Sequence, residues 1–430
     1  MKKTLFVCLL AQASVYGQSI ANEWNKELPK WIQFTGDYRA RVEGFSGGGF
    51  ADNKDDIYWL NRFRLNLAIK PTDWLTFFAQ GQDSRVWGKN QNPPVPPFQD
   101  TLDVRQAYLE IGGTEKKTFG LRAGRQEFVF GDQRLIGHLN WTNAARSFDG
   151  VRMTLRHNGY RLDAFASAVV VATDGQFDRR AKGNDFHGLY GGIEKLIPNA
   201  VIEPYALWRV APAQALEVSG KASTDFKTYG FRWVGKIPAA GFDYGVEMPF
   251  QRGKIGSTDT ISAWAAHYVA GQTLASLKWK PRVYGEYNFA SGDKDPKDRA
   301  HGTFDQLYPT GHDKYGIADQ VGWRNIHDLR AGVEFKPDAK WMVNGTYNNW
   351  WLAEAKDGLY TAAGALLLRN VAGTAGTHVG QELDGQATYS VTRQTQVGFG
   401  VGHLFPGQFI KSTTAGKSYT YPYVMLGYTF

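Results

Sequence analysis

An alternation of apolar and polar residues runs along most of this chain and limits what it can fold into. Between Ile32 and Glu43 the even-numbered residues are apolar, aromatic or small, and the odd-numbered residues are polar, four of the six being charged. A period of two residues is that of a β-strand, and this stretch exceeds the about 5–6 residues usual in soluble proteins. A long strand with one apolar and one charged face suits a wall between a bilayer and water.

The same pattern recurs often enough to build a closed barrel. Eighteen segments carry it, and an even number of strands is typical of bacterial outer-membrane barrels. The expected strands are 31–45, 57–70, 74–87, 101–112, 117–128, 148–157, 160–171, 185–197, 200–210, 225–236, 240–251, 260–271, 273–291, 324–337, 341–354, 378–392, 394–405 and 418–430. We therefore predict an all-β fold, a transmembrane antiparallel β-barrel of 18 strands that occupies residues 31–430 as one domain.

The connections between these strands alternate in length. Short ones at 70–73, 157–159, 198–199, 236–240, 337–339 and 392–393 carry mostly Pro, Asn, Asp and Gly, the residues of tight turns. Long ones fall between them, at 46–56, 88–100, 129–147, 172–184, 211–224, 252–259, 292–323, 355–377 and 406–417. This arrangement predicts short periplasmic turns and long extracellular loops.

The N-terminus has the pattern of a secretory signal. Lys2 and Lys3 precede a short apolar run, and Ala13, Ser14 and Gly17 supply small residues for a cleavage point. We expect a signal peptide over 1–18, a further segment over 19–30, and export to the outer membrane of a Gram-negative bacterium. A buried first helix is the alternative, since the run is too short to span a bilayer. The single cysteine, Cys8, lies in this run, which excludes a disulfide framework and a cysteine zinc site.

Composition excludes several other classes of protein. Mean hydropathy is −0.40, and no run of about 20 apolar residues is present, so the chain is not a helical membrane bundle. The net charge of +8 is spread without a basic block, so we expect no nucleic-acid partner. No GxSxG or HExxH motif occurs, which argues against the corresponding hydrolases, and we expect no enzyme activity and no cofactor.

Two weaker motifs have simpler structural explanations. Gly398, Gly400 and Gly402 faintly resemble a nucleotide loop, but their spacing places them on one face of a strand. Asp293, Asp295 and Asp298 could bind calcium, but the ligand pattern is incomplete and a solvated acidic loop accounts for them better. We therefore predict no metal site.

Arginines gather on the polar face of the expected strands. By register they include Arg39, Arg41, Arg62, Arg64, Arg152, Arg156, Arg282 and Arg330. Arginine keeps its charge and offers a planar fork for carboxylates, and a ring of such side chains in a pore selects anions. Carboxylates share that face, among them Asp37, Glu43, Glu334, Glu382 and Asp384. Arginine–carboxylate ladders that merely stiffen the wall are thus an equal alternative.

Several segments resemble the bacterial alginate export porin family. They are 36–43, 82–88, 103–108, 124–127, 131–137, 145–150, 304–312 and 380–384, and they span nearly the whole chain after the signal. The resemblance implies an eighteen-stranded outer-membrane barrel with an electropositive constriction for an anionic uronate polymer, gated by inward-folded loops. Segments 131–137 and 304–312 resemble the broad branch of the family outside alginate producers, which extends the expected solutes to other polyanions and small uronates.

The resemblance also implies particular pore residues. Matching positions are Arg39, Arg41, Arg125, Arg146 and Arg152. Arg125 needs a bulge at Gly124, because Leu121 and Ala123 set the opposite face. With the register argument, the expected pore lining is Arg39, Arg41, Arg62, Arg64, Arg125, Arg146, Arg152, Arg282 and Arg330, supported by Asp37, Glu43, Glu334, Glu382 and Asp384.

The predicted function is an outer-membrane porin that passes an anionic solute, such as alginate or an oligouronate, without chemistry. We expect it to contact outer-membrane lipid, the anionic polysaccharide or small uronate, and the barrel assembly machinery. A structural or adhesive barrel with a plugged lumen is one alternative. A barrel-embedded hydrolase is another, although no serine and histidine lie close together on one strand.

Overall fold

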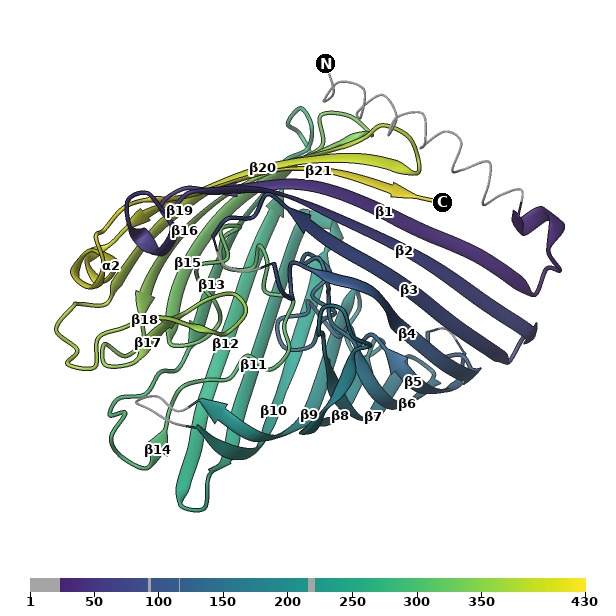
Figure 1. The fold of residues 1–430 in the computed structure, drawn as a ribbon, viewed down its shortest axis with the longest axis horizontal. Coiled ribbons are helices and arrows are strands. Elements are labelled where there is room, and N and C mark those ends of the chain that lie inside the picture. The colour runs from purple at the N-terminus through teal and green to yellow at the C-terminus, as the bar shows by residue number, and fades with distance from the viewer. Residues whose placement is uncertain (1–23, 92–93, 116, 216–220) are drawn as a thin grey trace.

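The described chain forms one closed β-barrel. The computed structural model describes residues 24–91, 94–115, 117–215 and 221–430. Within them, the barrel strands are β1 (Ile32–Phe45), β2 (Asp56–Thr72), β3 (Leu75–Trp87), β4 (Asp100–Gly112), β5 (Phe119–Gln126), β6 (Phe148–His157), β7 (Tyr160–Val171), β8 (Arg179–Ile193), β9 (Ala200–Ala215), β10 (Lys221–Ile237), β11 (Phe242–Ile255), β12 (Asp259–Thr273), β13 (Arg282–Ala290), β15 (Ile326–Phe335), β16 (Trp341–Leu352), β19 (His378–Ser390), β20 (Thr395–Pro406) and β21 (Tyr419–Thr429). Each is antiparallel to its neighbours, and β1 pairs with β21 to close the ring (Figure 1).

The remaining elements are small and lie in the long loops or the turns. They are β14 (Ala300–His301), β17 (Gly358–Tyr360), β18 (Leu366–Arg369), the helix α2 (Gln408–Thr413), and two 3-10 turns at Gly48–Phe50 and Pro238–Ala240. In the described part of the chain, no helix is long and apolar enough to cross a membrane. The expected signal peptide at 1–18, and residues 19–23 of the segment after it, lie outside the described residues.

The prediction of an 18-strand antiparallel barrel is confirmed, and every expected segment overlaps an observed strand. The largest errors are at the starts of two strands. β13 begins at Arg282, not at 273, because Trp279 and Lys280 lie in a turn with positive φ angles of 65° and 44°. The apolar–polar alternation of the strand continues into this turn, which is why the sequence placed the start of the strand too early. β8 begins at Arg179, not at 185, since Arg179 and Arg180 still pair with β7 beyond a shift in register.

The alternation places apolar side chains outside and charged ones inside. Leu383 on β19 is 58% exposed, whereas its neighbours Glu382 and Asp384 are 1% and 6% exposed. The outer face of such a strand contacts lipid, and the inner face contacts the lumen or what fills it.

This register predicts how two substitutions on β19 differ. Leu383→Arg places a charge on the lipid face, where it costs roughly 2–4 kcal/mol at the midplane. Gln386→Arg places the same charge on the inner face, where Gln386 bonds to the Tyr423 hydroxyl. We expect Leu383→Arg to lower the yield of folded, heat-modifiable barrel in outer membranes well below that of Gln386→Arg. Equal yields would contradict the register.

Two long loops fold into the barrel instead of extending outward. The first inner loop (residues 127–147) follows β5, and the second inner loop (residues 302–325) precedes β15. Phe128 in the first stacks on Phe148 of the wall at 4.9 Å between ring centroids, and Tyr308 in the second contacts Phe186 at 5.0 Å. The expected extracellular loop 129–147 and the later part of the expected loop 292–323 are therefore folded into the lumen.

The two inner loops pair with each other like a short parallel ladder. Tyr308 N donates to Leu135 O at 2.9 Å, and Gly137 N donates to Tyr308 O at 2.8 Å. A Cβ on Gly137 would lie 2.3 Å from Thr310 Oγ1, so glycine permits this close approach. The paired stretches are the segments 131–137 and 304–312 on which part of the family resemblance rested.

Candidate functional site

Five arginines project from the barrel wall toward the first inner loop. Arg39 and Arg41 come from β1, Arg62 and Arg64 from β2, and Arg105 from β4. Arg39 lies opposite Arg62 in the ladder, so the first four form one patch. All five, here called the wall arginines, are 2–8% exposed.

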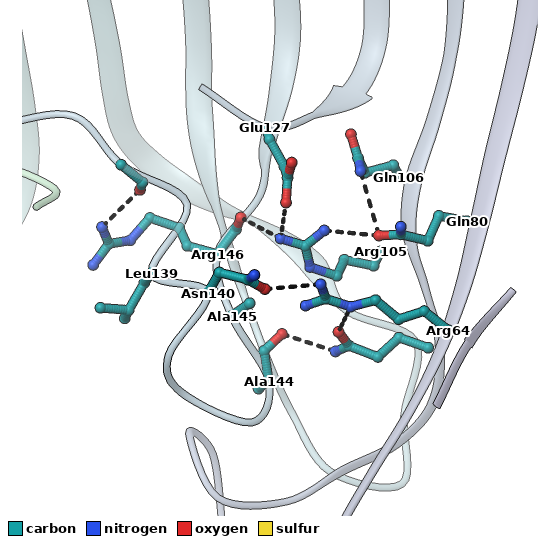
Figure 2. Close-up of polar contacts among 12 residues, drawn as sticks. Arg64, Gln80, Arg105, Gln106, Glu127, Leu139, Asn140, Ala144, Ala145 and Arg146 are labelled. Carbon is teal, nitrogen blue, oxygen red and sulfur yellow. Dashed lines mark hydrogen bonds and ion pairs between the residues drawn. The ribbon is translucent and has the colours of Figure 1, made fainter. Parts of the chain in front are cut away.

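The wall arginines donate mainly to the tip of the first inner loop. Arg39 Nη1 and Arg62 Nη1 both donate to the carbonyl of Asn140, at 2.8 and 2.9 Å. Arg64 Nη1 donates to the Asn140 side-chain oxygen at 2.8 Å (Figure 2). Arg41 Nη1 donates to the carbonyl of Trp141 at 2.8 Å. Neutral carbonyl oxygens thus accept the hydrogen bonds of four of the wall arginines.

Polar residues of the barrel wall add further hydrogen bonds to the loop tip. Gln82 Nε2 donates to Ala144 O at 2.8 Å, and Ser84 Oγ donates to Asn143 O at 2.9 Å. The Asn143 amide in turn donates to the carbonyls of Asn61, Arg85 and Phe98. The loop tip is therefore held both through its backbone carbonyls and through the side chains of Asn140 and Asn143.

The patch carries more positive than negative charge. Arg41 pairs with Glu43 at 2.5 Å, Arg62 with Asp37 at 3.4 Å, and Arg105 with Glu127 of the first inner loop (Figure 2). Burial raises the pKa of Glu127, but the Arg105 guanidinium and His138 lower it further, and its pKa lies below the usual value. Three carboxylates among five guanidinium groups leave a surplus of positive charge.

A stacked triplet joins the wall to both inner loops. The Trp141 ring lies 3.9 Å from the Arg41 guanidinium and 3.8 Å from the His312 ring, with the two rings nearly parallel. His312 Nδ1 lies 2.9 Å from an Asp319 carboxylate oxygen. Displacing the first inner loop would break this stack, so the two loops are coupled at this point.

The other predicted arginines hold different parts of the lumen. Arg146 donates to Pro309 O at 2.9 Å, and Arg330 donates to Lys314 O at 2.7 Å, so both bind the second inner loop. Arg152 pairs with Asp163 at 2.9 Å. Arg282 pairs with Asp243 and Glu334 at 2.7 and 2.9 Å, which is a ladder across the wall.

The bulge expected at Gly124 is not found. The pairing of β5 with β4 and β6 runs without a shift through Gly124, whose φ of 127° is accommodated within the ladder. Arg125 therefore keeps the face of Leu121 and Ala123, away from the wall arginines. It pairs with Asp149 at 2.8 Å near the long-loop end of the strands.

The predicted supporting carboxylates fall into two groups, which have different partners. Asp37 and Glu43 pair with wall arginines, and Glu334 pairs with Arg282. Glu382 instead accepts from the Ala318 amide of the second inner loop at 3.0 Å, and Asp384 accepts from Thr346 at 2.8 Å.

A polar cavity of about 370 Å³ lies beside residues 129–131 of the first inner loop, toward the short turns. Four arginines and three glutamates line it: Arg122, Arg152, Arg156, Arg161, Glu115, Glu127 and Glu203. Arg156 donates to Thr114 O at 2.9 Å and has no ion pair within the described residues. Alternation about Leu121 and Ala123 would have found Arg122, whereas Phe165 interrupts the alternation of the strand that carries Arg161.

Fold and site together define an outer-membrane β-barrel porin. The family model described as "Alginate export" matches residues 30–423, and the chain belongs to this family, whose members are channels and not enzymes. No curated protein matches the chain.

Solved channels of Pseudomonas aeruginosa share the fold. OpdQ matches with a TM-score of 0.63 and 12% identity over 94% of this chain and 99% of that one. OpdK with vanillate matches with a TM-score of 0.61 and 11% identity over 92% and 98%. OccK5 (OpdH) matches with a TM-score of 0.59 and 10% identity over 92% and 98%.

Proposed function

We propose that this porin passes an anionic solute, a uronate polysaccharide such as alginate or a smaller oligouronate, without changing it chemically. The observation that carries the proposal is the placement of arginine at two successive levels of the lumen. The wall arginines contact the tip of the first inner loop, and four more arginines line the cavity beside this loop. Arginine forks bind carboxylates strongly, and repeated sites along a path allow a chain to advance from one to the next.

The first inner loop is the proposed gate. In the state seen here the wall arginines donate to carbonyls of Asn140 and Trp141. Carboxylates accept such bonds more strongly than neutral carbonyls, so an arriving uronate chain competes for the same donors. The arginines then exchange loop oxygens for solute oxygens as the loop withdraws. Asp37 and Glu43 keep the guanidinium groups in place and limit the strength of solute binding.

The ion selectivity of a variant with a changed cavity-lining residue tests this proposal. Arg156→Glu reverses a lining charge that has no ion-pair partner in the described residues, so we expect it to move the reversal potential in a KCl gradient toward cation preference. Arg393→Glu, in the exposed turn between β19 and β20, is the matched control and should leave the potential of the parent unchanged. A cation-selective parent, or an Arg156→Glu variant with the parent's anion preference, would contradict the proposal.

A structural barrel with a closed lumen is the second candidate, and one observation favours it. The inner loops pack against the wall through a continuous buried cluster that includes Phe128, Phe304 and Trp323, each 0% exposed. A protein of this kind would give no stepwise conductance in planar bilayers, whereas a gated channel gives discrete openings.

Export and assembly belong to the same proposal. Residues 1–18 act as a cleaved signal peptide, and the barrel assembly machinery inserts the barrel by way of its last strand, β21. Mass spectrometry of protein from outer membranes should find an N-terminus shortly after residue 18, and an intact Met1 would contradict this step.

A further inference from the structure

A gap in the barrel ladder lies at the long-loop end of β4. The short strand β5 pairs with β4 only from Ala107 to Gly112, so the first residues of β4 have no partner in β5. The loop between β7 and β8 reaches across to this edge. Thr101 N donates to Asp174 Oδ1 at 3.0 Å, and Asp178 N donates to Asp103 Oδ2.

This contact brings three carboxylates together. One carboxylate oxygen from each of Asp100, Asp103 and Asp178 lies within 4.8 Å of the others. Asp100 and Asp103 are only 2% and 3% exposed, so bulk water does not separate the charges. Among the described residues, these three acidic side chains are close enough together to hold one metal ion.

Neighbouring cations do not neutralise the cluster. Arg125 Nη1 lies 3.8 Å from Asp103, but the same guanidinium pairs with Asp149 at 2.8 Å. Asp178 Oδ1 accepts from the Thr173 amide at 2.8 Å. Three carboxylates with one shared guanidinium leave a net negative charge close to two.

The Asp100 side chain is a separate indication of a missing partner. Its Oδ1 atom is buried and has no hydrogen-bond partner among the described residues, and one oxygen of the same carboxylate lies in the cluster. A buried, unpartnered carboxylate is costly unless something compensates it.

We propose that Asp100, Asp103 and Asp178 bind one Ca²⁺ ion on the extracellular side of the wall. Carboxylate oxygens are the ligands that Ca²⁺ prefers, and its charge matches the excess of the cluster. Water completes the coordination on the open side. The ion would fasten the loop between β7 and β8 to the unpaired edge of β4. The site differs from the acidic loop at Asp293, Asp295 and Asp298 considered from the sequence, and it does not depend on the solute of the channel.

Calorimetric titration of CaCl₂ into the purified barrel, folded in detergent and freed of metal with a chelator, tests the proposal. We expect one binding event with a Kd of about 0.1–1 mM or tighter, as for extracellular calcium sites. Asp100→Asn, a nearly isosteric change, should weaken binding at least tenfold, and Asp178→Asn should do the same. Asp295→Asn is the matched acidic control and should bind like the parent. Heat modifiability on gels establishes that each variant is folded.

Three results would overturn the site. They are no calcium binding by the folded parent, parent-like binding by both Asp100→Asn and Asp178→Asn, and loss of binding in Asp295→Asn. In a parallel titration, Mg²⁺ should bind more weakly than Ca²⁺, because Mg²⁺ demands a tighter octahedral shell and dehydrates reluctantly. Tighter Mg²⁺ binding would overturn the assignment of the ion as calcium.

Discussion

The triple variant Arg39→Ala/Arg62→Ala/Arg64→Ala should release the first inner loop and raise the open probability of the channel several-fold. These arginines donate to Asn140 and Thr142 at 2.8–3.0 Å. A hydrogen bond to a charged group contributes about 1.5–3 kcal/mol, and about 1.4 kcal/mol changes an equilibrium tenfold. Losing three such donors is therefore enough to shift the balance between the loop-bound and loop-free states. Single-channel recording in planar bilayers measures the effect.

A thiol reporter separates loop release from a change in pore charge. The single cysteine of the chain is Cys8, in the expected signal peptide, so an introduced cysteine would be unique in the exported barrel. Ala144 lies in the loop tip and is 5% exposed, so Ala144→Cys should react slowly with a polar maleimide in the parent background. We expect much faster reaction in the triple variant. Arg393→Ala is the control background, and equal rates in all three would show that the arginines do not hold the loop.

Arg209→Ala should be the most destabilising single change to the second inner loop. Arg209 on β9 donates to both oxygens of Asp305 at 2.8 Å, and Gln214 donates to Oδ2 at 2.9 Å. Removing one partner of a buried ion pair leaves an uncompensated charge and costs about 3–5 kcal/mol. The double variant Arg209→Ala/Asp305→Asn removes that charge and should recover much of the loss. Denaturant unfolding followed by heat modifiability provides the measurement, and a double variant as unstable as Arg209→Ala would contradict this explanation.

The same pair predicts a dependence on pH. Burial raises the pKa of Asp305, but Arg209 and Arg324 lower it further, so its pKa in the folded protein lies below the ordinary value. The stabilisation is therefore fully present above the unfolded pKa of about 3.9 and is lost as pH falls through the folded pKa. Arg209→Ala removes the largest lowering cause, so Asp305 takes up a proton at higher pH in the variant than in the parent, and the difference in stability should shrink as the pH falls.

The barrel could be predicted from local sequence because each strand signals its own two faces. Arg39, Arg41, Arg62 and Arg64 were assigned to the inner face by alternation alone, and the ladder between β1 and β2 makes them neighbours. Arg105 was missed because the ladder shifts between Gln80 and Gly81, which turns both Arg105 and Gln106 inward. Alternation carries no sign of such a shift.

The role of the inner loops could not be predicted from local pattern. Arg39 meets the carbonyl of Asn140 across 101 positions of sequence, and nothing in either segment alone specifies the contact. The family resemblance implied inward-folded loops. It included segments 131–137 and 304–312, but it did not indicate that these two segments pair. Their pairing depends on the close approach at Gly137, a tertiary feature.

Block of the parent channel by oligouronates tests the central claim most directly. An oligouronate and an uncharged oligosaccharide of equal length would be added in turn to one side of a planar bilayer that contains the porin. An arginine-lined path predicts brief, concentration-dependent block by the oligouronate, weakened by high salt through screening, and little block by the neutral sugar. Equal block by both sugars, or none by the oligouronate in an openly conducting channel, would contradict the proposal that this barrel passes uronates through its arginines.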